Sequence, residues 1–127
     1  METHILLVDD STTIRTSAAS CLRKAKYQVT EAVNGLDALE KLEILRAHGE
    51  NVSLVLTDLN MPEMDGITLI RRLREGPYKF VPVLVCSTET DRAVVEDGKS
   101  AGASGWLRKP FQADELLDAI EKLVWSR

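Results

Sequence analysis

The chain has 127 residues, 44% of them hydrophobic and 28% charged, with a formal net charge of −4. This length suits one core, so we expect residues 1–127 to form a single domain. The acidic balance argues against nucleic acid as a direct partner, and no apolar run is long enough to span a membrane. The first residues lack the features of a signal peptide, and Cys21 and Cys86 lie in apolar patterns without metal-binding spacing. We therefore expect a cytoplasmic protein with reduced, buried thiols.

Apolar patterns divide the chain into alternating strands and helices. The strand segments are short and mostly continuous in apolar residues, which is typical of strands covered on both faces in a parallel sheet. The helical segments carry apolar residues at intervals of three and four positions. In chain order, the expected elements are a strand at 5–8, a helix at 14–25, a strand at 27–32, a helix at 35–47, a strand at 52–57, a helix at 66–75, a strand at 81–86, a helix at 88–102, a strand at 104–110 and a helix at 113–125.

Two of the helical segments differ in how clearly they are patterned. The helix at 35–47 is expected to bury a stripe of leucines that begins with Leu36, Leu39 and Leu42. The helix at 88–102 is the weakest, because Gly98 in its interior costs about 1 kcal/mol relative to alanine and its apolar side is thin. The strict alternation of strands and helices nevertheless predicts a parallel sheet with helices on both faces.

Polar side chains follow every predicted strand except the second. Ligands of open parallel sheets bind beyond the carboxyl ends of the strands, so we expect these side chains to meet at one edge. Three carboxylates at that edge would repel one another unless a cation joined them, and oxygen ligands of this kind suit Mg²⁺. The side chains at these strand ends are those of Asp9, Asp10, Asp58, Ser87, Thr88 and Lys109.

Each of these residues also has a simpler explanation when it is taken alone. Asp9 or Asp10 at a strand-to-helix junction can cap the helix that follows. Asp58 can be a turn residue, and Lys109 can be a solvated side chain before a proline. The coincidence of acids, hydroxyls and a lysine at one sheet edge favours a common site.

Four linked motifs carry a resemblance to a known family. In the order VDDS, VLTDLNMPEMDG, PVLVCST and GASGWLRKPF, they resemble the receiver domain of two-component response regulators, over residues 4 to about 125. The chain looks most similar to the single-domain, chemotaxis-type members. The resemblance implies a flavodoxin-like (βα)5 fold, with a doubly wound five-stranded parallel sheet in the strand order 2-1-3-4-5.

The resemblance also implies a role for each polar residue at the sheet edge. Asp58 is expected to receive a phosphoryl group from a phosphohistidine, with Lys109 and the hydroxyl of Ser87 contacting the phosphoryl oxygens. Thr88, the next residue, offers the same chemistry as Ser87, although the register of the PVLVCS motif favours Ser87. Such a protein assists its own phosphorylation and dephosphorylation and is not an enzyme acting on a separate substrate. The implied Mg²⁺ ligands are Asp10, Asp58 and the main-chain carbonyl of Asn60, with Asp9 acting through water.

Signal output is implied for the surface formed by the fourth helix, the fifth strand and the fifth helix. Trp106 stands where the family has a switch aromatic, usually Tyr or Phe, which turns inward as Ser87 moves toward the phosphoryl group. An indole is bulkier than the rings of Tyr and Phe and needs a partner for its N–H when buried, which hinders full inward rotation of this side chain. Val94 and Val95 are candidate apolar contacts on this surface, with Lys99 and Glu121 at its rim. The family also has a cis peptide at Lys109–Pro110.

The lifetime of the phosphorylated state is expected to depend on two further positions. In the family, the residues two past the phosphoacceptor and two past the hydroxyl residue influence hydrolysis. These are Asn60 and Glu89, both polar and able to hold a water, so we expect a short-lived phosphoryl group.

Other functional classes fit the residues less well. A dehalogenase-type phosphatase needs a second catalytic Asp two positions after its nucleophile, where this chain has Asn60. A nucleotide-binding phosphate loop ending at Gly98 needs another glycine five residues earlier, where Ala93 stands. A flavin carrier needs a hydroxyl-rich loop after the first strand, where Asp9 and Asp10 would repel the flavin phosphate.

The expected partners are proteins. They are a sensor histidine kinase or a phosphotransfer protein as phosphoryl donor, and a downstream target that binds the output surface of a monomer. An alternative is a receiver domain cut from a larger regulator or hybrid kinase, which would pass the phosphoryl group onward as a phosphorelay intermediate.

Overall fold

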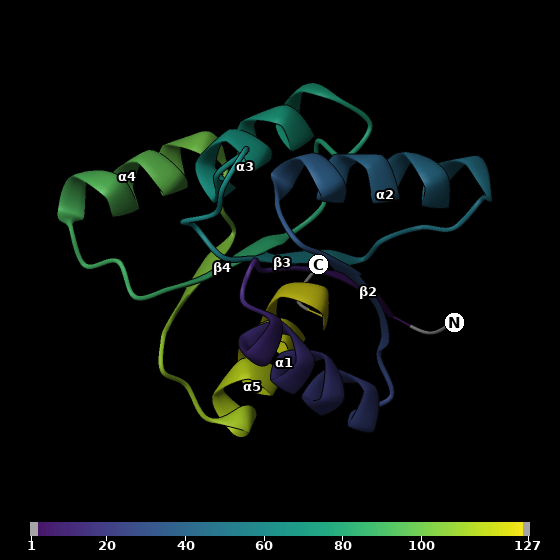
Figure 1. Ribbon diagram of the computed structural model, residues 1–127, viewed down its shortest axis with the longest axis horizontal. Helices are drawn as coiled ribbons and strands as arrows, with labels where there is room; N and C mark the ends of the chain where they lie inside the picture. Colours follow the sequence, from purple (N-terminus) through teal and green to yellow (C-terminus); the bar gives the residue numbers. More distant parts are fainter. Residues whose placement is uncertain (1–2, 126–127) are drawn as a thin grey trace.

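The computed structural model describes residues 3–125 and contains a parallel sheet of five strands between two layers of helices (Figure 1). The sheet order β2-β1-β3-β4-β5 confirms the expected topology. α2, α3 and α4 cover one face, and α1 and α5 cover the other (Figure 1). The elements are β1 (His4–Val8), α1 (Thr12–Lys24), β2 (Gln28–Ala32), α2 (Gly35–Ala47), β3 (Leu54–Thr57), α3 (Gly66–Glu75), β4 (Val83–Ser87), α4 (Arg92–Ala101), β5 (Gly105–Arg108) and α5 (Ala113–Trp125).

The central strand β1 sets the geometry of the sheet edge. It pairs with β2 on one side and β3 on the other, so that Val8 lies level with Ala32 and with Thr57. The ladder continues one residue further, because the amide of Asp58 donates to the carbonyl of Val8 at 2.9 Å. This register brings the residues that follow β1 and β3 to the same end of the sheet.

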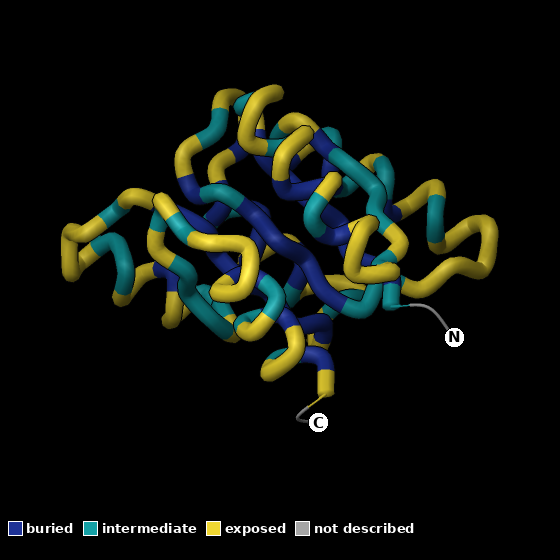
Figure 2. The backbone as a smooth tube through the Cα atoms, turned by 90° about the horizontal axis from the view of Figure 1, so that it is seen from below, coloured by how far each residue is buried: buried dark blue, intermediate teal, exposed yellow. Residues whose placement is uncertain are grey.

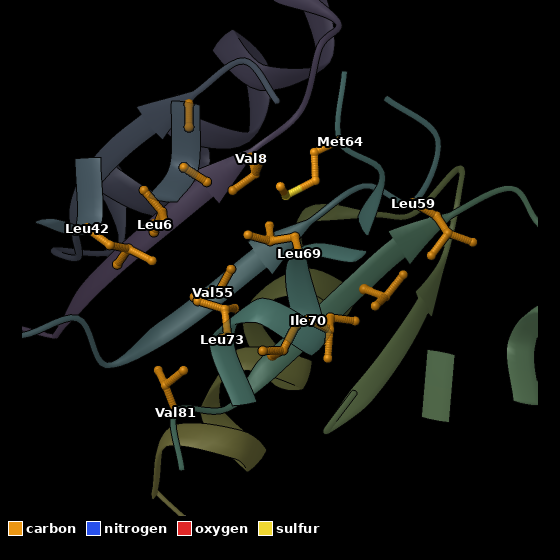
Figure 3. Close-up of a cluster of buried hydrophobic side chains, with 14 residues drawn as sticks. Leu6, Val8, Leu42, Val55, Leu59, Met64, Leu69, Ile70, Leu73 and Val81 are labelled. Carbon is orange, nitrogen blue, oxygen red and sulfur yellow. The ribbon is translucent and has the colours of Figure 1, made fainter. Parts of the chain in front are cut away.

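Alternate side chains of the strands fill two separate hydrophobic clusters. Ile5 and Leu7 of β1 join the cluster under α1 and α5, whereas Leu6 and Val8 join the cluster under α2 and α3. Figure 3 shows the cluster under α2 and α3, in which Leu69 of α3 lies beside the strand side chains. The inner strands β1, β3 and β4 are buried along their whole length, the edge strands β2 and β5 are mostly partly buried, and the outer sides of the helices are exposed (Figure 2). The continuous apolar runs of the sequence therefore reflect a sheet that is covered twice.

The boundaries of several elements differ from those expected. The expected strand 52–57 begins only at Leu54, and the strand 104–110 is limited to residues 105–108. The helix expected at 88–102 spans residues 92–101, because the side chain of Asp91 caps it by accepting from the amide of Ala93 at 2.8 Å. Capping of this kind defines where the helix begins.

The expected leucine stripe of α2 is wrong in part. Leu36 is 44% exposed, and the buried residues of α2 are Gly35, Ala38 and Leu42. A Cβ atom on Gly35 would lie 2.7 Å from Cγ of Met64, so the first turn of α2 packs closely through its glycine. The helix is thus turned about its axis away from the orientation that the leucines indicate.

The thiols are free in the part of the chain that the structure describes. Cys86 is buried in β4, and burial raises the pKa of its thiol to about 12. Cys21 is only partly buried, at the inner side of α1. Among the helices of residues 3–125, none has the length and apolar character needed to cross a membrane.

Candidate functional site: an acidic pocket at the sheet edge

Three carboxylates meet beyond the ends of β1 and β3. Oxygen atoms of Asp9, Asp10 and Asp58 all lie within 4.8 Å of one another. Asp9 is buried, Asp58 is partly buried and Asp10 is exposed, so the pocket opens to solvent on the Asp10 side. The convergence expected from the strand ends is therefore present.

Lys109 reaches the same pocket from the segment after β5. Its Nζ lies 3.0 Å from Oδ2 of Asp9 and 3.6 Å from Oδ2 of Asp58. Its amide donates to the carbonyl of Ser87 at 3.0 Å, and the peptide bond to Pro110 is cis, as the family resemblance implied. The lysine side chain is only 12% exposed, so its charge acts inside the pocket.

The ionisation of the pocket follows from this arrangement. Burial raises the pKa of Asp58, and the charges of Asp9 and Asp10 add to this effect, while a hydrogen bond from the Leu59 amide and the charge of Lys109 oppose it. Burial alone would lower the pKa of Lys109, but its hydrogen bond to Asp9 and the charge of Asp58 raise it overall. The pocket brings three carboxylates to one ammonium, and a bound cation would relieve the repulsion among the acids.

The donor set fits Mg²⁺. Carboxylate oxygens from two strand ends, beside an exposed Asn60 whose carbonyl belongs to the same loop, are hard ligands of the kind that this ion prefers. Asp9 is the most constrained of the three acids, because its Oδ1 accepts from the amide of Ser11 at 2.9 Å and its Oδ2 binds Lys109. The more open carboxylates of Asp10 and Asp58 are therefore better placed for direct coordination.

The two hydroxyl residues after β4 occupy different environments. Ser87 is fully buried, and its Oγ accepts from the amide of Glu89 at 3.0 Å. Thr88 is exposed and lines a cavity of about 490 Å³ between α1 and α5, which also contacts Lys109. Glu89 turns its carboxylate toward the start of α4, where Oε2 accepts from the amide of Asp91 at 3.1 Å. Glu89 therefore holds the turn that precedes α4, next to the capping residue Asp91, a role that the sequence pattern did not indicate.

Trp106 lies on the side of β5 that faces α4. It is partly buried and packs against the cluster beneath α2, α3 and α4. A Cβ atom on Gly98 would lie only 2.6 Å from Cζ3 of the indole. Because glycine has no side chain, α4 leaves room here for the ring of Trp106. Val94 and Val95 of α4 are partly buried, whereas Lys99 and Glu121 are exposed.

One residue near the pocket was missed by sequence reasoning. Arg15 of α1 donates from Nη1 to the main-chain carbonyl of Asp9 at 2.7 Å, and its Nε lies 3.3 Å from Oε1 of Glu31. It is the fourth residue of α1, about one helical turn from the start of the helix, which is the only signal that the sequence offered.

Comparisons with known proteins identify the family to which the chain belongs. The family model for the response regulator receiver domain matches residues 5–121. Chemotaxis protein CheY of Bacillus subtilis is 37% identical, over 98% of this chain and 99% of its own length. The crystal structure of CheY4 of Vibrio cholerae at low pH has a TM-score of 0.87 and 35% identity, with 97% of this chain and 99% of that chain covered.

A longer relative shows the same domain in another setting. Chemotaxis protein CheV3 of Helicobacter pylori is 33% identical over 97% of this chain, but the chain spans only 41% of its length. The matching region, the sheet order and the acidic pocket all agree with one assignment. The chain belongs to the response regulator receiver domain family.

Proposed function

We propose that this protein is a phosphoacceptor of a two-component signalling system and that Asp58 receives the phosphoryl group. The donor would be a phosphohistidine of a sensor histidine kinase or of a phosphotransfer protein. The observation that carries the proposal is the juxtaposition of the partly buried Asp58 carboxylate with two further acids within 4.8 Å and with the Lys109 ammonium at 3.6 Å.

The chemistry is a transfer between two anionic groups. A carboxylate oxygen of Asp58 forms a bond to phosphorus as the bond from phosphorus to the histidine nitrogen breaks, and the product is an acyl phosphate. Catalysis of such a step consists mainly of positioning and of neutralising charge on the phosphoryl oxygens. Lys109 supplies one positive charge, and the hydroxyl of Ser87 or Thr88 supplies a hydrogen-bond donor.

Mg²⁺ would be held by the carboxylates of Asp10 and Asp58 and by the carbonyl of Asn60, with Asp9 in support. When bound, the ion supplies further neutralisation of the transferring group. Asp9 has a second task, because it holds the Lys109 ammonium at 3.0 Å in the unphosphorylated state. The phosphoryl group adds roughly −1.5 to −2 charges and strong acceptor oxygens, which compete with Asp9 for that ammonium.

Output would proceed through α4, β5 and α5. A buried Ser87 at the end of β4 and a Trp106 packed against α4 connect the phosphorylation site to this surface. Phosphorylation is proposed to shift these elements and to alter the binding of a downstream protein. Hydrogen exchange measured with and without beryllofluoride should change in α4 and β5 more than in α2, and equal exchange throughout would contradict the proposal.

The phosphoacceptor itself is tested by replacing Asp58. In Asp58→Asn the carboxylate nucleophile is lost, so labelling by acetyl phosphate with Mg²⁺, followed by intact-protein mass spectrometry, should disappear. Asp118→Asn, which removes an exposed carboxylate of α5, should be labelled like the unmodified protein. Undiminished labelling of Asp58→Asn would remove Asp58 from its proposed role.

A second candidate follows from the match to a longer relative. The same domain would act as a phosphorelay intermediate in a larger regulator or hybrid kinase and would pass its phosphoryl group to another histidine. Phosphorylated protein mixed with histidine phosphotransfer proteins distinguishes the two, because an intermediate loses its label to the histidine, whereas an output protein loses it to water.

A further inference from the structure

Arg15 links three segments that surround the acidic pocket. Through Nη1 it contacts the turn between β1 and α1, at the carbonyl of Asp9 (2.7 Å), and through Nε it contacts Glu31 of β2 (3.3 Å). Its side chain is only 13% exposed. The first contact is made to the main chain between Asp9 and Asp10, the second to a strand residue level with Leu7, and neither to a pocket carboxylate.

The contact to Asp9 has a consequence for its neighbour. The carbonyl of Asp9 belongs to the peptide unit that joins Asp9 to Asp10, and a peptide unit is planar. The other polar atoms of Asp9 are also occupied, since its amide donates to the carbonyl of Ala32 at 3.1 Å and its carboxylate binds Ser11 and Lys109. A hydrogen bond from Arg15 to the remaining acceptor therefore fixes the plane from which the exposed Asp10 side chain projects.

We propose that Arg15 is a positioning residue for the magnesium site, which clamps the Asp9–Asp10 peptide so that the Asp10 carboxylate faces Asp58 before the ion binds. This inference rests on the proposed function. A bare positive charge near the pocket would oppose the binding of a cation, but the Glu31 carboxylate, which lies 3.3 Å from both Arg15 and Arg23, offsets part of the guanidinium charge. Arg15 thus contributes geometry at a reduced electrostatic cost.

The two simultaneous contacts require a guanidinium. Its nitrogen atoms form a rigid planar fork, which donates to the carbonyl and to Glu31 in fixed directions. The ammonium of a lysine is a single point and does not reproduce this fork. Arg15→Lys therefore keeps the charge and loses the geometry, whereas Arg15→Met loses both.

Mg²⁺ affinity measured by isothermal titration calorimetry tests the inference without any phosphorylation step. Loss of a group that orients a metal ligand typically weakens metal binding by about 10-fold to 100-fold, so we expect Arg15→Met and Arg15→Lys to bind Mg²⁺ about tenfold more weakly. Arg23→Met is the matched control, because Arg23 lies at the same distance of 3.3 Å from Glu31 but is 52% exposed and lies outside the pocket. Its Mg²⁺ affinity should be unchanged.

The results separate geometry from charge. If Arg15→Lys binds Mg²⁺ like the unmodified protein while Arg15→Met binds it more tightly, Arg15 acts only as a repelling charge and the inference is overturned. It is also overturned if both variants keep the original affinity. If the unmodified protein itself does not bind Mg²⁺ at millimolar concentration, the proposed magnesium-dependent function fails together with it.

Glu31→Gln provides a second approach that leaves Arg15 in place. This variant removes the carboxylate that offsets the guanidinium charge, so Mg²⁺ affinity should fall, and the fall should shrink as added salt screens the uncompensated charge. The double variant Glu31→Gln with Arg15→Met should bind Mg²⁺ as tightly as Arg15→Met alone, because the Arg15 charge on which Glu31 acts is then absent. Full additivity of the two losses would contradict the coupling. Urea unfolding in chelator checks that each variant is folded.

Discussion

Replacing Lys109 by methionine tests the electrostatic design of the pocket. The Nζ of Lys109 lies 3.0 Å from a carboxylate of Asp9, and the two side chains are 12% and 5% exposed. Removing one partner of a buried ion pair costs about 3–5 kcal/mol, because the other charge is left uncompensated. Since Asp9 keeps its hydrogen bond from Ser11, we expect a loss near the lower limit, about 3 kcal/mol, in the free energy of unfolding without metal.

The assay is urea or thermal unfolding of Lys109→Met, in chelator and in Mg²⁺. For a chain of this size, 3 kcal/mol corresponds to a fall in Tm of roughly 10 °C. Mg²⁺ should restore much of this loss, because a cation in the pocket replaces the missing ammonium, so the ion should stabilise the variant more than the unmodified protein. Lys41→Met is the control, since its ion pair with Asp37 is partly exposed (38% and 23%) and should cost less than about 1 kcal/mol.

Two outcomes would refute this reasoning. If Lys109→Met and Lys41→Met lose the same stability in chelator, the lysine does not compensate a buried charge. If Mg²⁺ stabilises Lys109→Met no more than the unmodified protein, the ion and the ammonium do not share one electrostatic site.

Three further predictions concern other parts of the fold. Gly98→Ala should lower the free energy of unfolding by about 1 kcal/mol, because crowding against the Trp106 ring, 2.6 Å from the new Cβ, outweighs the usual gain of alanine in a helix. In a Trp125→Phe background it should also increase acrylamide quenching of Trp106; a stabilised variant with unchanged quenching would show that the ring does not occupy the space beside α4. Burial lowers the pKa of His4 in the folded protein below its unfolded value of 6.5, so the neutral imidazole favours folding. The free energy of unfolding should be highest above pH 6.5 and should fall as the pH drops below that value. Urea midpoints at pH 5 and pH 7 should therefore differ less in His4→Gln, and an equal difference would contradict this assignment. Arg74 donates to main-chain carbonyls before β4 and after α4 at 2.6 to 3.3 Å, so Arg74→Met should lose about 3 kcal/mol in urea unfolding, and a loss below about 1 kcal/mol would contradict its bridging role.

The overall fold was predictable because its signals are local. Apolar runs such as ILLV (5–8) mark strands that are buried on both faces, and their alternation with helical patterns requires parallel crossover connections. Element boundaries were less predictable, because caps such as that of Asp91 depend on side-chain direction. The orientation of α2 was not predicted either, because it depends on the close approach of Gly35 to Met64 and not on the spacing of the leucines.

The chemistry of the pocket was readable from residue types, because the rule for parallel sheets brings strand ends together whatever the details of packing. The roles of Gly98 and Arg15 were not readable in this way. Gly98 appeared to be a weak point in a helix, yet its missing side chain provides the space for Trp106. No sequence pattern distinguished Arg15, yet it contacts both the turn after β1 and the neighbouring strand β2.

The physical reason is the range of the interactions. Hydrophobic periodicity and charge are properties of neighbouring residues, so they specify the order of elements and the acids at their ends. The direction of a carboxylate or the space around an indole depends on atoms contributed by residues distant in the chain. For that reason Asp9 could be placed at the pocket in advance, whereas its ion pair with Lys109, 100 residues later, emerged only from the folded arrangement.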